Sequence, residues 1–77
     1  MFVSTITIYV KGVARSNIEI LTNNNFNKLD TDSKNRAKDI FETGYKFEGL
    51  DKEGIPTRSF YPPNAIHRVD WRITEED

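Results

Sequence analysis

The strictest pattern in the chain is an alternation of apolar and polar side chains near its N-terminus. Residues 5–10 read Thr-Ile-Thr-Ile-Tyr-Val, which turns the aliphatic side chains to one side and Thr5, Thr7 and Tyr9 to the other. A period of two in β-branched and aromatic residues predicts a β-strand with one buried face. Because a lone strand is not stable, the rest of the chain must supply its neighbours.

The chain has 77 residues, of which 36% are hydrophobic. That is enough for one core, so we expect a single domain. With no cysteine and one histidine, no disulfide or Cys/His metal centre is expected to hold it together. Stability must come from packing or from a partner chain, which makes self-association an expectation. No run approaches the roughly 20 apolar residues of a membrane-spanning helix, and the lack of cysteine fits a cytoplasmic location.

A second strand is expected around residues 18–21, joined to the first by a loop through residues 12–17. This loop pairs Ile8 with Ile20 and so keeps the apolar faces of both strands together, which is what normally specifies register. A Ser-x-x-Glu capping box also falls within this segment. Residues 12–22 are therefore either a loop followed by a strand or a short helix.

A helix is expected in the middle of the chain. Residues 30–32, Asp-Thr-Asp, offer N-terminal caps, and Ala37, Ile40 and Phe41 recur at helical spacing on one face. Gly44 supplies the C-terminal stop, since glycine accepts the left-handed backbone that ends many helices. A helix with three core-facing residues depends on packing against a sheet.

Three further strands are expected after the helix, at residues 45–48, 55–60 and 68–73. The first two form a hairpin in which Tyr45 opposes Phe60, and Pro56 marks an edge because it cannot donate to a ladder. The order β-β-α-β-β-β over residues 1–74 predicts an α+β domain with one helix packed on a mostly antiparallel sheet. Residues 75–77, all acidic, are expected to form a frayed tail.

No set of residues has the spacing of a catalytic centre, so we expect a protein that is not an enzyme and uses no cofactor. His67 is the only imidazole, and nothing in the sequence places a nucleophile or carboxylate beside it. Asp30 and Asp32 resemble the start of a calcium loop, but Asn35 stands where that loop requires glycine. No metal site is therefore predicted.

The charges are nearly balanced, with eleven Lys and Arg against twelve Asp and Glu. A protein that coats a polyanion usually shows a basic excess. Aromatic and basic residues nevertheless alternate in the second half of the chain, as in sheets that stack bases while arginines hold phosphates. The candidate contacts to nucleic acid or a protein partner are Lys46, Arg58, Tyr61, Arg68 and Arg72.

The core competes for the same aromatic side chains. A domain of this size needs large apolar groups, each burying roughly 150–250 Å², and the five expected in the core are Tyr45, Phe47, Phe60, Tyr61 and Trp71. The N-terminal strand has neither a proline nor a bulge residue to prevent it from pairing with another chain. Thr5, Thr7 and Tyr9 are therefore a candidate oligomer edge, with a position at the sheet centre as the alternative.

The segment FYPPNAIHRVDW, residues 60–71, resembles the C-terminal end of small uncharacterised proteins encoded by phages and prophages of low-GC Gram-positive bacteria. The resemblance implies an accessory binding protein in the cytoplasm of a bacterial host. The leading prediction is a non-enzymatic interaction protein that binds a macromolecular partner and self-associates. The alternative is a single-stranded nucleic-acid-binding module.

Overall fold

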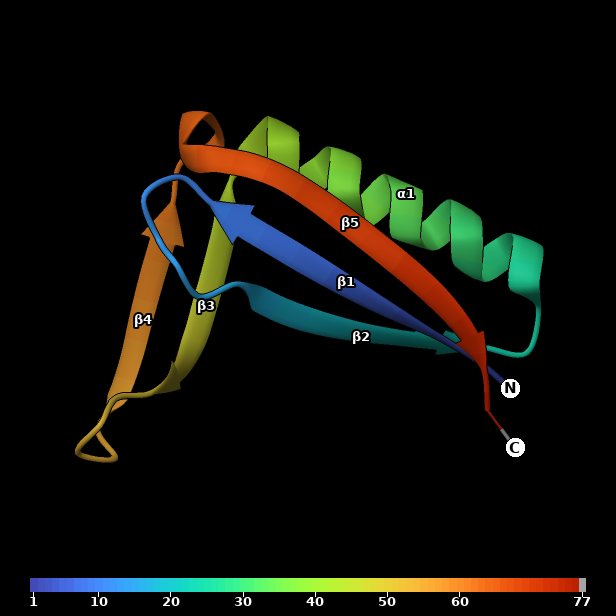
Figure 1. The fold of residues 1–77 in the computed structure, drawn as a ribbon, viewed down its shortest axis with the longest axis horizontal. Helices are drawn as coiled ribbons and strands as arrows, with labels where there is room; N and C mark the ends of the chain where they lie inside the picture. The colour runs from blue at the N-terminus through green and yellow to red at the C-terminus, as the bar shows by residue number, and fades with distance from the viewer. Residues whose placement is uncertain (77) are drawn as a thin grey trace.

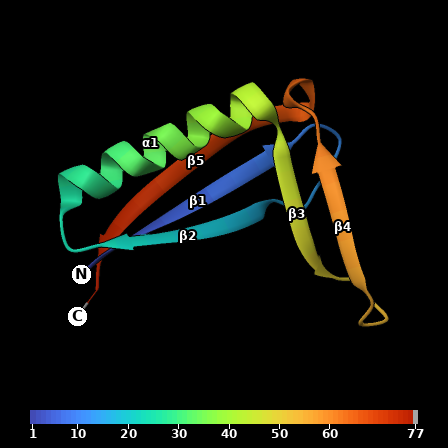
Figure 2. The same cartoon turned by 180° about the vertical axis from the view of Figure 1, so that it is seen from behind.

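The N-terminal strand lies at the centre of the structure. The computed structural model describes residues 1–76, and in it β1 (Phe2–Val10) pairs antiparallel with both β2 (Asn17–Asn23) and β5 (Ile66–Glu75). The sheet order is β2-β1-β5, and α1 (Phe26–Thr43) packs on one side of it (Figures 1 and 2). We call these four elements the body. The predicted α+β fold, one helix on an antiparallel sheet, is confirmed.

A hairpin extends away from the body, as both ribbon views show (Figures 1 and 2). It is made of β3 (Tyr45–Leu50) and β4 (Pro56–Tyr61), which pair only with each other among the described strands. We call residues 45–61 the arm. A short 3-10 turn, η1 (Pro63–Ala65), leads from the arm back to β5. No helix within residues 1–76 has the length and apolar character needed to span a membrane.

The core lies between the sheet and α1. The alternation of β1 is confirmed, because Ser4, Ile6, Ile8 and Val10 are buried under the helix while the intervening side chains are half-buried on the other side. The remaining buried apolar residues are Leu29, Ala37, Ile40, Tyr45, Ile66 and Val69. Every element of the body contributes a buried residue to this core except β2, whose Leu21 is partly buried and packs against it.

The helix begins four residues before the acidic cluster at residues 30–32. Asn25 is the N-cap, and its Oδ1 accepts the backbone N–H of Lys28 at 3.0 Å. An asparagine cap satisfies one of the amide groups that a helix start leaves unpaired. Asn25, the last of three consecutive asparagines, therefore starts the helix, in place of the expected caps at residues 30–32.

The helix ends where the sequence predicts. Gly44 has φ of 91°, a left-handed conformation that favours glycine, and its amide donates to the Ile40 carbonyl at 2.8 Å. Ala37 and Ile40 are buried as expected, but Phe41 is 44% exposed and its placement in the core was wrong. Leu29, in the first turn of α1, is buried instead.

A fully buried polar contact joins α1 to β1. Ser4 Oγ and Ser33 Oγ are 2.6 Å apart, and Ser33 Oγ donates to the Leu29 carbonyl at 2.8 Å. Each hydroxyl has one hydrogen, so Ser4 must donate to Ser33. Both buried hydroxyls are thus paired, which avoids the desolvation cost of an unsatisfied group.

The register between β1 and β2 differs from the expected one. Ile18 lies opposite Thr7 and Ile20 opposite Thr5, so the predicted pairing of Ile8 with Ile20 was wrong. The connecting loop, residues 11–16, is long as expected, and the alternative of a short helix was wrong because residues 17–23 are a strand. The shift turns both isoleucines away from α1.

Glu19 occupies the helix side of β2 in their place. Its Oε2 lies 2.8 Å from Arg36 Nη2, and Arg36 Nη1 also contacts Asp39 at 3.0 Å. A charged side chain is tolerated beneath a helix when it is paired and hydrogen-bonded. Arg36 therefore explains why Ile18 and Ile20 need not face the core, whereas Leu21 still packs against it.

The arm also departs from the expected register, by one residue. Tyr45 opposes Tyr61 rather than Phe60. The edge position expected for Pro56 is confirmed, because each strand of a two-stranded hairpin has a free side. Of the five aromatic residues expected in the core, only Tyr45 is buried. Tyr61 is half-buried against the core, whereas Phe47, Phe60 and Trp71 are 37%, 56% and 36% exposed.

The chain ends of the body lie side by side (Figure 1). Glu75 pairs with Phe2 as the last residue of β5, and the Glu76 amide donates to the Met1 carbonyl at 2.8 Å. The strand therefore includes Glu75, which was expected to lie in the frayed tail, and Glu76 is still hydrogen-bonded to the first residue of the chain. Asp77 lies outside the described residues.

Candidate interaction surfaces

The sheet leaves one face uncovered within the described residues. Because side chains alternate along each strand, the residues opposite those under α1 share this side, which we call the open face. Thr5, Thr7 and Tyr9 lie in its middle row. Their candidacy as an oligomer edge was wrong, since β1 is paired on both sides and the free edges belong to β2 and β5.

The two outer rows of the open face differ in chemistry. On β2 the row consists of Ile18, Ile20 and Thr22, and the two isoleucines are 59% and 56% exposed. On β5 the row consists of Arg68, Asp70, Arg72 and Thr74. An apolar row therefore lies along one edge of the sheet and a charged row along the other.

Arg68 is held against its neighbours on the open face. Its guanidinium carbon lies 4.4 Å from the centroid of the Tyr9 ring, and its Nε lies 3.2 Å from Asp70 Oδ2. Tyr9 and Asp70 both raise the pKa of Arg68 above its ordinary value. The aromatic ring that would stack a base beside this arginine already stacks the arginine itself.

The arm exposes more large apolar side chains than it buries. Phe47, Leu50, Ile55 and Phe60 are 37%, 70%, 53% and 56% exposed. Phe47 lies over Gly49, where an added Cβ would approach the ring to 2.7 Å. The charges of the arm balance, because residues 45–61 contain three basic and three acidic side chains.

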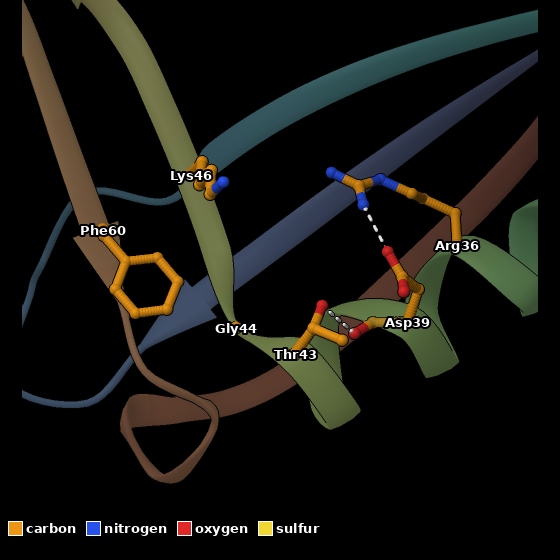
Figure 3. Close-up of a pocket in the computed structure, with 6 residues that line it drawn as sticks. All are labelled: Arg36, Asp39, Thr43, Gly44, Lys46 and Phe60. Carbon is orange, nitrogen blue, oxygen red and sulfur yellow. Dashed lines mark hydrogen bonds and ion pairs between the residues drawn. The ribbon is translucent and has the colours of Figure 1, made fainter.

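A pocket of about 420 Å³ lies where the arm meets α1 (Figure 3), and it is lined by Arg36, Asp39, Thr43, Gly44, Lys46 and Phe60. The polar side chains that α1 contributes to this pocket form hydrogen bonds within the protein. Arg36 binds Glu19 and Asp39, and the Thr43 hydroxyl donates to the Asp39 carbonyl at 2.8 Å. The hydrogen bonds to Glu19 raise the pKa of Arg36.

Gly44 allows the close approach of the two segments that form this pocket. A Cβ at this position would collide with the carbonyl oxygen of Tyr61 and come within 3.0 Å of the Phe60 ring. Gly44 is thus required twice, for its positive φ and for space. The pocket is therefore the junction between arm and body, in which Arg36, Asp39 and Thr43 bind one another and neighbouring groups.

The predicted contact residues do not form one surface. Lys46 and Arg58 lie on the arm, Arg68 and Arg72 lie on the open face of β5, and Tyr61 packs against the core. The indole of Trp71 is directed to the helix side, where its N–H donates to Asp30 Oδ1 at 3.0 Å. The exposed isoleucines of β2 were missed because the sequence pattern suggested that they faced the core. Leu50 and Ile55, the exposed apolar residues at the arm tip, were not among the predicted contacts either.

His67 is exposed at the start of β5. Within residues 1–76 no group of three or more His, Cys, Asp or Glu side chains is arranged to hold a metal ion. Comparison with known proteins found no matching family model, no matching curated protein and no matching solved structure. The surfaces themselves must therefore carry the functional argument.

Proposed function

We propose that this protein is a non-enzymatic interaction module that binds a protein partner through its arm. The observation that carries the proposal is the exposure of four large apolar side chains on a hairpin that extends from the body. A two-stranded hairpin alone is at best marginally stable in water. The register places Phe47 on one face of the hairpin and Leu50 and Phe60 on the other, so both faces of the arm expose apolar surface. Exposed apolar surface concentrated on one small element is typical of a binding site.

The chemistry of the arm favours a protein over a nucleic acid. Its three positive and three negative charges leave no excess to neutralise phosphates. Lys46 lies opposite the aromatic Phe60, and Arg58 lies opposite the acidic Glu48, so the two basic side chains do not lie opposite each other. The partner expected from this pattern has an apolar groove with charges of both signs at its rim.

The wider setting of the proposal comes from the sequence. The resemblance of residues 60–71 to phage and prophage proteins supports an accessory binding role in a bacterial cytoplasm. The cysteine-free composition is compatible with that compartment. The phage origin and the location are therefore part of the proposal.

The proposal is tested by cross-linking from single positions. The chain contains no cysteine, so Leu50→Cys and Lys34→Cys each create a unique attachment point for a photoactivatable label. Leu50 is at the arm tip and Lys34 is exposed on α1. In a cell extract, we expect a defined protein to be cross-linked from position 50 and not from position 34.

A matched substitution completes the test. Leu50→Lys and Ile55→Lys should each weaken binding of that protein by about 30-fold or more, as expected when an apolar anchor worth about 2 kcal/mol is lost. Equal labelling from both positions, or full binding by both lysine variants, would overturn the proposal. Binding of a labelled single-stranded oligonucleotide that falls steeply with salt would support the nucleic-acid alternative instead.

A further inference from the structure

We propose that β2 is a self-association edge, along which a second copy of this chain pairs antiparallel and extends the three-stranded sheet to six strands. The inference concerns the body and does not depend on what the arm binds. It starts from a difference between the two free edges of the sheet. β1 is enclosed between them, so a second copy can extend this sheet only at β2 or β5.

The edge at β5 is protected against pairing. It carries Arg68, Asp70 and Arg72, and its register with β1 shifts at Tyr9 and Val10. Charged side chains and bulges are the usual devices that keep an edge strand from pairing with another chain. The edge at β2 pairs with β1 without a register shift, and its single charge, Glu19, is taken up by Arg36 of the same chain.

The apolar row of the open face runs along this unprotected edge. Ile18 and Ile20 are more than half exposed although they sit in a regular strand. The register with β1 places both isoleucines on the open face instead of in the core. Glu19 lies on the helix side and is paired with Arg36. A neighbouring strand would cover both side chains and pair the backbone groups along the edge.

The sequence of β2 is compatible with itself across a two-fold axis. With the axis perpendicular to the sheet at Ile20, antiparallel pairing places Ile20 opposite Ile20 and Ile18 opposite Thr22 on the open face. Asn17 then meets Asn23, and Glu19 meets Leu21 rather than another acid. No residue of β2 then lies opposite a like charge, so the strand can form an isologous interface with itself. This self-complementarity is what identifies the occupant as a second copy.

The helices leave room for such a dimer. In the six-stranded sheet, three strand spacings of about 4.8 Å separate the two β1 strands, a total of about 14 Å. Packed helices need only about 8–10 Å between their axes. Because α1 packs on all three strands of its own sheet, the two helices can lie on the same side of the larger sheet.

Sedimentation equilibrium with matched variants tests the proposal. The wild-type chain is expected to form a particle of twice its 8.9 kDa mass. Ile20→Lys places two like charges at the axis, and we expect the dimer dissociation constant to rise by about 100-fold or more. Ile55→Lys makes the same change at a similarly exposed position on the arm, 53% against 56%, and should leave the dimer intact.

Cross-linking gives a second and positive readout. Ile20→Cys puts a single thiol on the axis in a chain without other cysteines, so mild oxidation should link two chains, whereas Ile55→Cys should stay monomeric on a denaturing gel. A wild-type chain that remains monomeric, or a dimer broken by Ile55→Lys and not by Ile20→Lys, would overturn the proposal. Ile20→Lys should still bind the arm's protein partner, so the two proposals fail independently.

Discussion

Body and arm contain the same kind of strand but reach different degrees of burial. In β1, every second side chain from Ser4 to Val10 is buried beneath α1. In β3, Tyr45 is buried at the base of the arm, yet Phe47, the next residue on the same face, is 37% exposed. Apolar and polar side chains alternate over residues 45–48 of β3 as they do over residues 5–8 of β1. Burial is decided by whether another layer lies across the strand, and α1 supplies that layer only for the body.

This difference assigns stability and recognition to separate parts of the molecule. The body has its buried apolar residues, the Ser4–Ser33 contact and the Glu19–Arg36 ion pair to hold it together. The arm is held mainly by its own ladder and by its attachment at Gly44 and Tyr61. Substitutions in the two parts should therefore have unequal effects on folding.

The largest contrast is expected between Ile40→Ala and Leu50→Ala. Ile40 is fully buried under the sheet, and truncating a buried aliphatic side chain costs about 2–5 kcal/mol. Leu50 is 70% exposed at the arm tip, so the same type of change should alter the free energy of unfolding by less than about 0.5 kcal/mol. Urea unfolding followed by circular dichroism measures both. Equal losses would show that the arm shares the core of the body.

The junction can be probed with two glycines that both have positive φ. Gly44 and Gly54 have φ of 91° and 79°, so alanine strains the backbone at both, by about 1–2 kcal/mol. At Gly44 the new methyl group also meets the Tyr61 carbonyl, whereas nothing lies within 4 Å at Gly54. Gly44→Ala should therefore lower the melting temperature more than Gly54→Ala. Similar melting temperatures for the two variants would contradict the close approach of residue 44 to the Tyr61 carbonyl.

The hydrogen bond between the buried hydroxyls of Ser4 and Ser33 can be tested by replacing each serine with alanine. Ser33→Ala removes the acceptor of the Ser4 hydroxyl and should cost about 1–3 kcal/mol. Replacing both serines with alanine should cost less than the sum of the single changes, because no unpaired hydroxyl then remains. A double-mutant cycle in urea measures this coupling. Strict additivity would contradict a hydrogen bond between the two side chains.

The smallest expected effect is a dependence on pH at the base of the arm. Burial raises the pKa of the Tyr45 hydroxyl, Glu19 adds to the rise, and Arg36 opposes it. The pKa of Tyr45 in the folded chain therefore lies above the unfolded value of about 10. The contribution of the neutral hydroxyl to the free energy of unfolding is complete below pH 10 and is lost as the pH rises through the folded pKa. Tyr45→Phe should show a shallower loss of stability above pH 10. Identical alkaline profiles would contradict the burial of this hydroxyl.

Much of the architecture could be predicted from the sequence because it rests on local signals. The alternation at residues 5–10, the stop at Gly44 and the apolar face of the final strand, with Val69 buried, each reflect backbone or pattern preferences within a few residues. The element order follows from them. Packing of the helix on the sheet is then the one arrangement that covers the buried side of β1.

Registers and surfaces could not be predicted, since they depend on contacts between distant residues. The expected pairing of Ile8 with Ile20 assumed that all apolar residues share one buried face. Arg36, seventeen residues from Glu19, removes that constraint by satisfying the carboxylate under the helix. The exposure of Phe47 is a similar case. The arm has no covering layer within residues 1–76, and the residues next to Phe47 in the sequence give no sign of this.

The pairing of β1 with β5 has a consequence for how the chain folds. Phe2 and Glu75 are partners, so this ladder joins nearly the two extremes of the described chain and encloses α1 and the arm within its loop. Contacts of such long sequence separation form slowly, because the entropy of closing the loop is lost before any contact is gained. During synthesis, β1 and β2 can meet early, while the other side of β1 must wait for β5. A nascent chain therefore presents an open β1 edge, and avoiding premature association depends on how quickly its last strand arrives.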